Sequence, residues 1–411
     1  MPANSSSAAD VFPAILAMIQ DRNTWSMTIV EERGEVHTAP MLDPETLSLE
    51  NPITQTVYEP KKNLLTIRTE HGDHIFVELP RSECESPIGG RPSIYLDQRD
   101  WSGVSNVRFN PERVTNGGTV DATQKLIDLA RNRDVILPVS SAHLVETTRW
   151  SDGLQRYRLA LTILELSRGW QMRYPLGVWE DEITKALLKR YKGLDYAYPE
   201  VLTLAPCALE PGGISSYRSS EVDSLPPEAA FITKAIVCST ARIAVALSTD
   251  HIPRVDAPEW TREFQRISDL LSQEQWSPSQ RRNALDWTLL TDIRDQTINA
   301  ILRSGIDKDD LSDWMSNHFS EDIKKMPCLG LWREVYQDKH LDIQNKWKNN
   351  DLIDMMFLTC ACGYCTHVIS ERQFAGFLRQ GVKRLGRSVK IFSRVEELVS
   401  ALESDGIRGC E

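Results

Sequence analysis

The stretch that most constrains this chain is residues 349–374, which read NNDLIDMMFLTCACGYCTHVISERQF. Residues 352–362 are almost all apolar or small, a pattern typical of a helix that is buried on most of its surface. Asp351 and Asp354 lie three residues apart in its first turn and therefore share one face. After a Gly-Tyr break a short buried strand follows, with Glu371 just beyond its end. The stretch thus predicts carboxylates gathered at one edge of a sheet.

Acidic residues at the start of a helix also have a purely structural explanation. Asp side chains there complement the helix macrodipole, and Asn350 or Asp351 can serve as the N-cap. The stretch alone does not separate this explanation from a functional one. The acids elsewhere in the chain are needed to decide.

Length and composition limit the function classes. With 411 residues the chain is long enough for two or three domains, and its net charge of −11 means that any nucleic-acid contact needs a local basic patch. Its eight cysteines lack the rhythm of a disulfide scaffold, which favours reduced thiols and a cytoplasmic location. The N-terminus has no basic region typical of a signal peptide, and no apolar run approaches about 18 residues, so no membrane contact is expected.

Composition divides the chain into four segments. Residues 1–90 contain strand-like stretches and a glycine turn, and they predict a β-rich N-terminal module. Strands and helices alternate in residues 91–204 and again in 346–405, which predicts one α/β domain built from two parts. Residues 205–345 open with a loop rich in Gly, Ser and Pro and predict an all-helical insertion. Its expected helices cover residues 228–247, 259–271, 279–303 and 320–348.

The first part of the α/β domain alternates strand and helix. Residues 93–97 predict a strand, 119–132 a helix, 135–139 a second strand, and a Ser-capped helix carrying Glu146 follows. This order predicts a parallel sheet sandwiched by helices, with right-handed crossovers. Functional crevices in such sheets lie at the carboxyl ends of the strands, where Asp97 stands.

Four acid-bearing sequence motifs resemble those of the PIN-like nuclease family. They are IYLD with Asp97, SSAHLVET with Glu146, NDLIDMMFL with Asp351 and Asp354, and HVISER with Glu371. The resemblance covers about half of the chain, split around the helical insertion. It implies a PIN-like domain and a metal-dependent endoribonuclease that hydrolyses RNA phosphodiester bonds with Mg²⁺ or Mn²⁺.

The resemblance also implies a role for each acid. Asp97 and Asp354 would be the main metal ligands, Glu146 a ligand or the residue that orients the attacking water, and Glu371 the acid that closes the site. Asp351 would be a ligand in place of Asp354 or only a charge at the helix start. Independently of the family, Mg²⁺ and Mn²⁺ prefer hard oxygen ligands, and clustered carboxylates repel one another without a cation.

Two departures from the family pattern leave a second interpretation open. A further acid often stands shortly before the last strand of these proteins, but Thr366 occupies that position here. Glu371 also replaces the shorter Asp that is common after the strand. The first alternative is a catalytically inactive scaffold that binds RNA or a protein partner, the latter through the N-terminal module or the helical insertion. The second is a helical interaction protein in which the insertion is the working part.

A basic stretch follows Glu371 and is the expected contact surface for the substrate. Residues 372–394 contain seven Lys or Arg and no acid. Such a local excess suits the phosphates of RNA, with single-stranded DNA as the alternative substrate. The predicted substrate-binding residues are Arg372, Arg379, Lys383 and Arg384.

Two other groups near these acids have less specific signals. His143 precedes Glu146 by three residues on the same helix face, so it is expected near the site, in the core or as a hydrogen-bonding neighbour. Cys360, Cys362 and Cys365 with the nearby His367 contain ligand types that zinc favours. Because this cluster runs from a buried helix into a strand, tight packing of small residues is the preferred interpretation.

Overall fold

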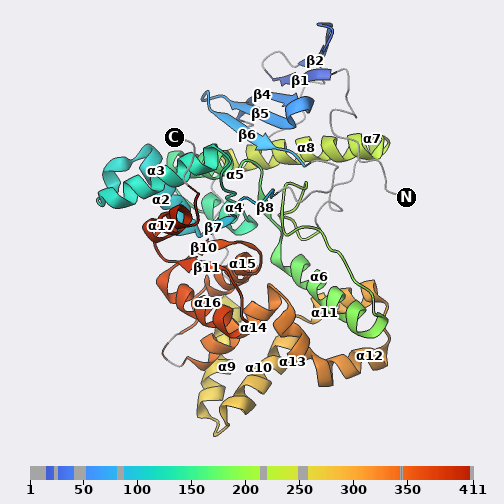
Figure 1. Ribbon diagram of the computed structural model, residues 1–411, viewed down its shortest axis with the longest axis vertical. Coiled ribbons are helices and arrows are strands. Elements are labelled where there is room, and N and C mark those ends of the chain that lie inside the picture. The colour runs from blue at the N-terminus through green and yellow to red at the C-terminus, as the bar shows by residue number, and fades with distance from the viewer. Residues whose placement is uncertain are drawn as a thin grey trace.

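The structure, a computed structural model, has an antiparallel sheet near one end, a mostly helical body at the other, and a small parallel sheet between them (Figure 1). The parallel sheet joins distant parts of the sequence, because β7 (Ile94–Leu96) pairs with β10 (His367–Ile369). The residues that the structure describes are 15–22, 26–40, 52–80, 88–212, 220–248, 258–342, 344 and 346–407.

The N-terminal sheet has six antiparallel strands in the order β3-β2-β1-β4-β5-β6. The β5–β6 hairpin confirms the predicted pair of strands, and Gly72 in its turn has a φ of +84°, a conformation that glycine adopts without strain. Leu65 and Ile67 alternate with more exposed neighbours, so one face of the sheet is buried. The strands are β1 (Ile15–Asp21), β2 (Ser26–Glu31), β3 (Val36–Pro40), β4 (Ile53–Glu59), β5 (Leu64–Thr69) and β6 (His74–Glu78).

Three short strands form the parallel sheet, in the order β11-β10-β7. They are β7 (Ile94–Leu96), β10 (His367–Ile369) and β11 (Lys390–Phe392). β10 pairs with β7 so that Ile369 lies opposite Leu96. The sheet therefore joins the two parts of the predicted α/β domain across the helical segment.

The predicted fold class, a PIN-like parallel sheet sandwiched by helices, is wrong. Among the described residues the largest sheet is the antiparallel one, and the parallel sheet has three strands of three residues. The strand expected at residues 135–139 forms only isolated bridges, from Ile136 to Ser93 and from Val139 to Gln171. Pro138 between them has no N–H to donate, and the chain changes neighbour there, so no continuous ladder forms.

Helices make up most of the chain after β7. The first group is α2 (Gln98–Phe109), α3 (Gly117–Arg131), α4 (Ser141–Thr148), α5 (Gly153–Ser167) and α6 (Pro175–Leu187), and the two-residue strands β8 (Gln171–Met172) and β9 (Leu202–Thr203) pair beside them. The middle group is α7 (Ser220–Asp223), α8 (Pro227–Leu247), α9 (Pro258–Gln273), α10 (Pro278–Asp292), α11 (Arg294–Ser304), α12 (Lys308–Asp313), α13 (Phe319–Asp322) and α14 (Leu329–Leu341). The last group is α15 (Asp351–Tyr364), α16 (Arg372–Arg384) and α17 (Val395–Ser404).

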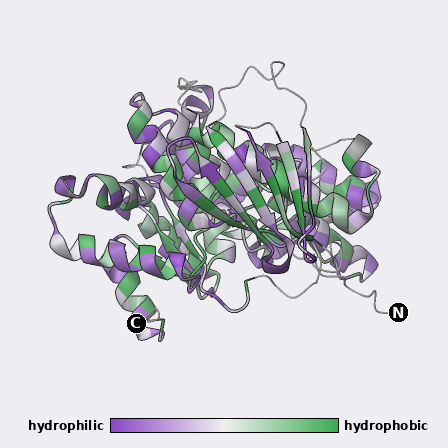
Figure 2. Cartoon of the chain, turned by 90° about the horizontal axis from the view of Figure 1, so that it is seen from above, coloured by the Kyte–Doolittle hydropathy of each residue, from purple (hydrophilic) through white to green (hydrophobic). Residues whose placement is uncertain are grey.

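The buried face of the N-terminal sheet packs against α5 and α8. Its strands contribute Leu65, Ile67 and Ile75 to a core that also contains Leu161 of α5 and Ile232 of α8. Figure 1 shows α8 running along this sheet, and Figure 2 shows apolar residues following the central strands while the peripheral helices alternate between apolar and polar positions. The module is thus joined to the helical body by a shared hydrophobic core.

One segment of α8, Ala229–Leu247, is long and apolar enough to cross a membrane by length and composition alone. Ile232, Ile243 and Leu247 of this helix are buried in the core beneath the N-terminal sheet, whereas Val237 and Val245 are exposed. Packing inside the protein therefore accounts for part of its apolar surface.

Candidate metal centre

The carboxyl ends of β7 and β10 bring Asp97 and Glu371 to the same edge of the parallel sheet. Asp97 follows β7 directly and caps α2, since its Oδ1 accepts a hydrogen bond of 2.8 Å from the Gln98 backbone N–H. Glu371 follows β10 by two residues and stands at the N-cap position of α16. Because Leu96 and Ile369 are paired in register, the chains after them leave the sheet side by side.

The charges of these two acids act on each other. Burial raises the pKa of Asp97, and the Glu371 carboxylate raises it further. Hydrogen bonding from the Gln98 backbone N–H and the nearby Arg99 guanidinium oppose that rise. Asp97 is thus a partly buried carboxylate in a mainly acidic environment.

Asp354, in the first turn of α15, completes this acidic group. Burial raises its pKa to about 8, and the carboxylates of Asp97, Glu146, Asp351 and Glu371 add to the rise. Without a cation, the Asp354 carboxyl therefore favours its protonated form at neutral pH. The structure therefore brings together all five acids that the sequence singled out, close enough for their charges to interact.

Asp351 has a different environment from Asp354. Its carboxylate is almost fully buried, and its Oδ2 lies 3.0 Å from Nζ of the completely buried Lys339 and accepts a 2.7 Å hydrogen bond from the Lys348 backbone N–H. The Lys339 ammonium also lies over the ring of Trp347, 4.9 Å from its centroid. Asp351 thus pairs with a cation of α14, whereas the charges that shift the pKa of Asp354 are those of other carboxylates.

Glu146 reaches the acidic group from α4, whose start is well defined. Ser140 and His143 form a capping box there, with the Ser140 N–H donating to His143 Nδ1 at 3.1 Å. The His143 ring stacks on Tyr95 of β7 with ring centroids 4.9 Å apart, and burial lowers the His143 pKa to about 3. His143 is therefore a neutral core residue that fixes α4 against β7 and so orients the helix that carries Glu146.

Asp100 also belongs to the acidic group, although the sequence analysis did not include it. Burial raises its pKa to about 6, with Asp97 and Glu371 among the charges that contribute and Arg99 opposing them. The signal was present, because Asp100 follows Asp97 by three residues and so lies near it in the first turn of α2. Arg99 donates to both the Asp100 carboxylate and the Ser393 carbonyl.

The donor set at this edge fits a hard divalent cation. Asp354, Asp351 and Glu371 line a pocket of about 310 Å³ together with residues of the preceding loop and of α16, whereas Asp97 and Glu146 are not part of its lining. Oxygen ligands in a partly open site suit Mg²⁺ or Mn²⁺. The spacing is looser than in a closed cage: in the part of the chain that the structure describes, no three of these acids have ligand atoms all within 4.8 Å. Mg²⁺ commonly keeps several waters, which bridge such gaps.

Among the residues that the structure describes, the ligand atoms of Glu31, Glu35 and His37, at the β2–β3 turn, do lie within 4.8 Å of one another. His37 and Glu35 are exposed, and the His37 Nε2 lies 3.5 Å from Glu31. Exposed groups of this kind are common without a metal ion, and this one lies on the N-terminal sheet rather than at the acidic edge.

The predicted substrate-binding cations divide into two kinds. Arg379 donates from Nε and Nη2 to the Ile391 carbonyl, and Arg384 pairs with Glu334 and Asp338 of α14. Both side chains therefore also hold α16 against its neighbours. Arg372 and Lys383 are exposed on α16, and Arg372 directly follows Glu371.

Thr366, at the position where the family pattern has an acid, lies at the amino end of β10, whereas the acids lie at the carboxyl ends of the strands. Its hydroxyl donates to the Ser93 carbonyl at 2.8 Å and contacts His367 Nδ1 at 2.8 Å. Cys360, Cys362 and Cys365 are buried free thiols, and burial raises the pKa of each. Raised thiol pKa values oppose the thiolate form that zinc binds, which agrees with a packing role.

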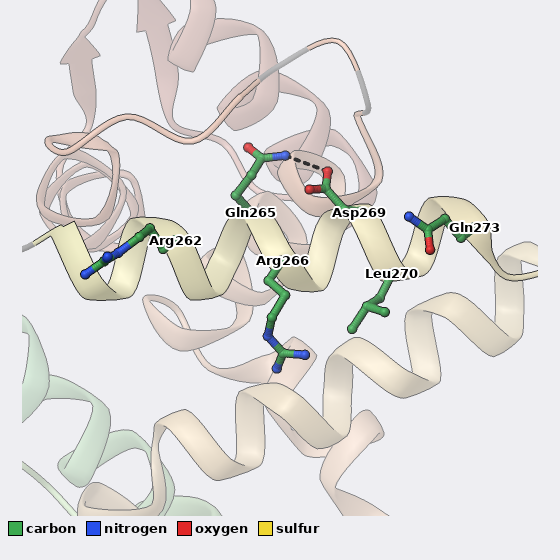
Figure 3. A pocket seen from close by; sticks show the side chains of 6 residues that line it. All are labelled: Arg262, Gln265, Arg266, Asp269, Leu270 and Gln273. Atoms are coloured by element: carbon green, nitrogen blue, oxygen red, sulfur yellow. Dashed lines mark hydrogen bonds between the residues drawn. The ribbon is translucent and has the colours of Figure 1, made fainter.

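Two larger pockets lie away from the acidic edge. One of about 660 Å³ opens at the amino ends of β10 and β11 and is lined in part by Lys325, Arg387 and Lys390. The other, of about 350 Å³, is lined by residues of α9, where Gln265 donates to Asp269 and Arg262 lies nearer the start of the helix (Figure 3). Neither contains any of the predicted metal ligands.

No protein-family model, curated protein or solved structure matches this chain.

Proposed function

We propose that this chain is a metal-dependent endoribonuclease that uses Mg²⁺ or Mn²⁺ bound at the acidic edge of β7 and β10. The observation that supports the proposal best is the raised pKa of Asp354, which results from burial among Asp97, Glu146, Asp351 and Glu371. Burying several carboxylates around one point costs stability unless a cation is present. The proposal depends on the resemblance of the acid-bearing motifs to those of PIN-like nucleases. It does not depend on the PIN-like fold that was predicted with them.

Asp97 and Asp354 would hold the cation, because the Asp97 charge acts on Asp354 and Asp351 is already paired with Lys339. A bound Mg²⁺ or Mn²⁺ polarises a phosphodiester and lowers the pKa of an attacking water. Glu146 would accept a hydrogen bond from that water and so orient it, and Glu371 would close the site. Arg372 would bind an adjacent phosphate, since it is the first residue of α16 and directly follows Glu371.

The test is cleavage of a labelled single-stranded RNA with Mn²⁺, with Mg²⁺ and with EDTA. We expect cleavage only with the metals, and a loss of at least about 100-fold in Asp97→Asn and Asp354→Asn, because each substitution removes a ligand charge. Glu35→Gln is the matched control, since it removes an acid of the other potential metal group and should leave the rate unchanged. Cleavage that survives in both Asn variants would refute the proposal.

Metal binding can be measured apart from cleavage. Mn²⁺ should raise the thermal unfolding midpoint of the wild type in a concentration-dependent way, because a ligand that binds only the folded state stabilises it. Asp354→Asn should lose this shift while remaining folded. A labelled single-stranded DNA of the same sequence, run in parallel, tests the alternative substrate.

The second candidate function is a catalytically inactive scaffold that binds RNA or a protein partner. It is favoured by the loose spacing of the acids within the described residues and by Thr366 at a position where PIN-like nucleases often have an acid. Under this proposal RNA binding persists in EDTA and is unaffected by Asp354→Asn. Metal-dependent cleavage would exclude it.

A further inference from the structure

Cys207 and Cys238 bring two free thiols into contact from distant parts of the chain. Their sulfur atoms lie 2.9 Å apart although the residues are 31 positions apart in the sequence. Cys207 follows β9, and Cys238 lies in the middle of α8. Sulfur atoms in a disulfide are about 2.0 Å apart, so bond formation requires a movement of roughly 0.9 Å.

The backbone at Cys207 is held in an uncommon conformation. Its φ is +57°, in the left-handed region that few residues other than glycine adopt. The following residue is tied to the start of α6, because the Tyr174 N–H donates to the Ala208 carbonyl at 3.1 Å. Constraints of this type keep the Cys207 side chain directed at α8 instead of leaving it mobile.

Arg242 provides a second, independent feature. It lies one helical turn after Cys238, and its charge acts on both sulfur atoms. Its Nε is buried and has no hydrogen-bond partner among the described residues. A buried guanidinium beside two thiols favours the thiolate form, and the Glu210 carboxylate opposes it.

We propose that Cys207 and Cys238 form a reversible disulfide in response to a low-molecular-weight disulfide such as oxidised glutathione. Cys238 is the more exposed of the two, so its thiolate attacks the glutathione disulfide, forms a mixed disulfide and releases one glutathione thiolate. The Cys207 thiol then loses its proton and attacks the Cys238 sulfur, which releases the second glutathione. The protein loses two electrons and two protons, and oxidised glutathione is reduced to two glutathione thiols.

The bond would link the middle of α8 covalently to the segment that follows β9. α8 shares its apolar side with the N-terminal sheet, whereas the segment around Cys207 is attached to β9 and α6. Oxidation would therefore fasten α8, and with it the N-terminal sheet, to the helical body. Because burial raises the pKa of Cys238 to about 12, the exchange is slow compared with that of an exposed thiol.

The experiment uses the reduced full-length protein in glutathione buffers of increasing oxidised fraction. After quenching with an alkylating reagent and digestion without reductant, we expect a linked pair of peptides that contain Cys207 and Cys238. Dithiothreitol should abolish this link. Cys362 should be recovered only in its alkylated form. The oxidised protein should also unfold at a higher temperature, and the shift should disappear on reduction.

Variants separate the specific pair from general oxidation. Cys207→Ser and Cys238→Ala should each lose both the linked peptides and the thermal shift, whereas Cys362→Ser should keep them. Arg242→Met should slow the oxidation several-fold. The proposal is overturned if the folded wild type yields both cysteines alkylated in oxidised glutathione, if Cys238 retains glutathione without a link to Cys207, or if linkage appears only in denaturant.

Discussion

Substituting Asp351 should destabilise the protein because it leaves a buried ammonium without its counter-charge. Lys339 is completely buried, and its Nζ lies 3.0 Å from the Asp351 Oδ2. In Asp351→Asn the amide oxygen still accepts the Lys348 N–H, so the main loss is the ion pair. Removing one partner of a buried pair costs about 3–5 kcal/mol, and because Lys339 keeps the aromatic rings of Trp347 and Phe374 beside it, we expect the lower end of that range.

Urea unfolding at neutral pH measures the effect, with EDTA present so that no metal contributes. A double-mutant cycle with Lys339→Met isolates the pair, because the double variant removes both charges and should lose much less stability than the sum of the single losses. Glu321→Gln is the control: Glu321 pairs with Lys325 at 2.6 Å, but both side chains are exposed, so we expect no measurable change. A loss below about 1 kcal/mol in Asp351→Asn, or additive losses in the cycle, would refute this account of Asp351.

Three further predictions concern other parts of the fold. Glu182 is buried, accepts hydrogen bonds from the Cys328 and Leu329 N–H groups and from the Tyr364 hydroxyl, and has its pKa raised to about 7 by burial. The stability that the protonated Glu182 contributes is therefore complete below the unfolded pKa and is lost as pH rises through 7. Between about pH 5 and pH 8 the unfolding free energy of the wild type should fall by about 2 kcal/mol relative to that of Glu182→Gln. Equal pH dependence of the two proteins would contradict this. Gly363→Ala should destabilise the protein in thermal unfolding despite the better helix propensity of Ala, because the new Cβ would lie 2.8 Å from the Pro327 backbone, whereas Gly376→Ala meets nothing within 4 Å and should be neutral or stabilising. Trp150 is 40% exposed just beyond α4. If it stacks on a base, Trp150→Ala should weaken single-stranded RNA binding by about 5-fold or more and leave the unfolding midpoint unchanged. Equal affinities of the two proteins in a binding titration would exclude that role.

Local pattern was sufficient for the elements that carry the acids. The apolar run after Asp351 predicted α15, the short β10 was found within one residue of its expected end, and Asp97 and Glu371 lie at the carboxyl ends of their strands. These features depend on neighbours in the sequence and on the rule that parallel strands end at one edge. Position at that edge is therefore readable from sequence, whereas the distances between carboxylates are not.

Interactions between distant segments account for what was not predicted. Nothing near Asp351 in the sequence identifies Lys339 as its partner, because a loop separates α14 from α15. The expected helix at 279–303 divides at Ile293, whose φ of −95° and ψ of 18° leave the helical region without any Gly or Pro signal. By contrast, Pro327 was a visible signal against a single helix over 320–348, since a proline inside a helix removes a hydrogen bond and clashes with the preceding turn.

The ion pair between α14 and α15 also bears on how the helical segment relates to the acidic edge. α14 lies within the predicted insertion of residues 205–345, yet it packs against both α15 and α16, and its Glu334 and Asp338 bind Arg384. Deleting that segment would remove both Lys339, the counter-charge of Asp351, and the surface of α14 that packs against α15 and α16. We therefore expect a chain without residues 205–345 to fail to fold, even if the segment contributes nothing to RNA binding. Loss of activity in such a deletion would say nothing about catalysis, whereas Lys339→Met with Asp351→Asn tests the connection and keeps the rest of the fold in place.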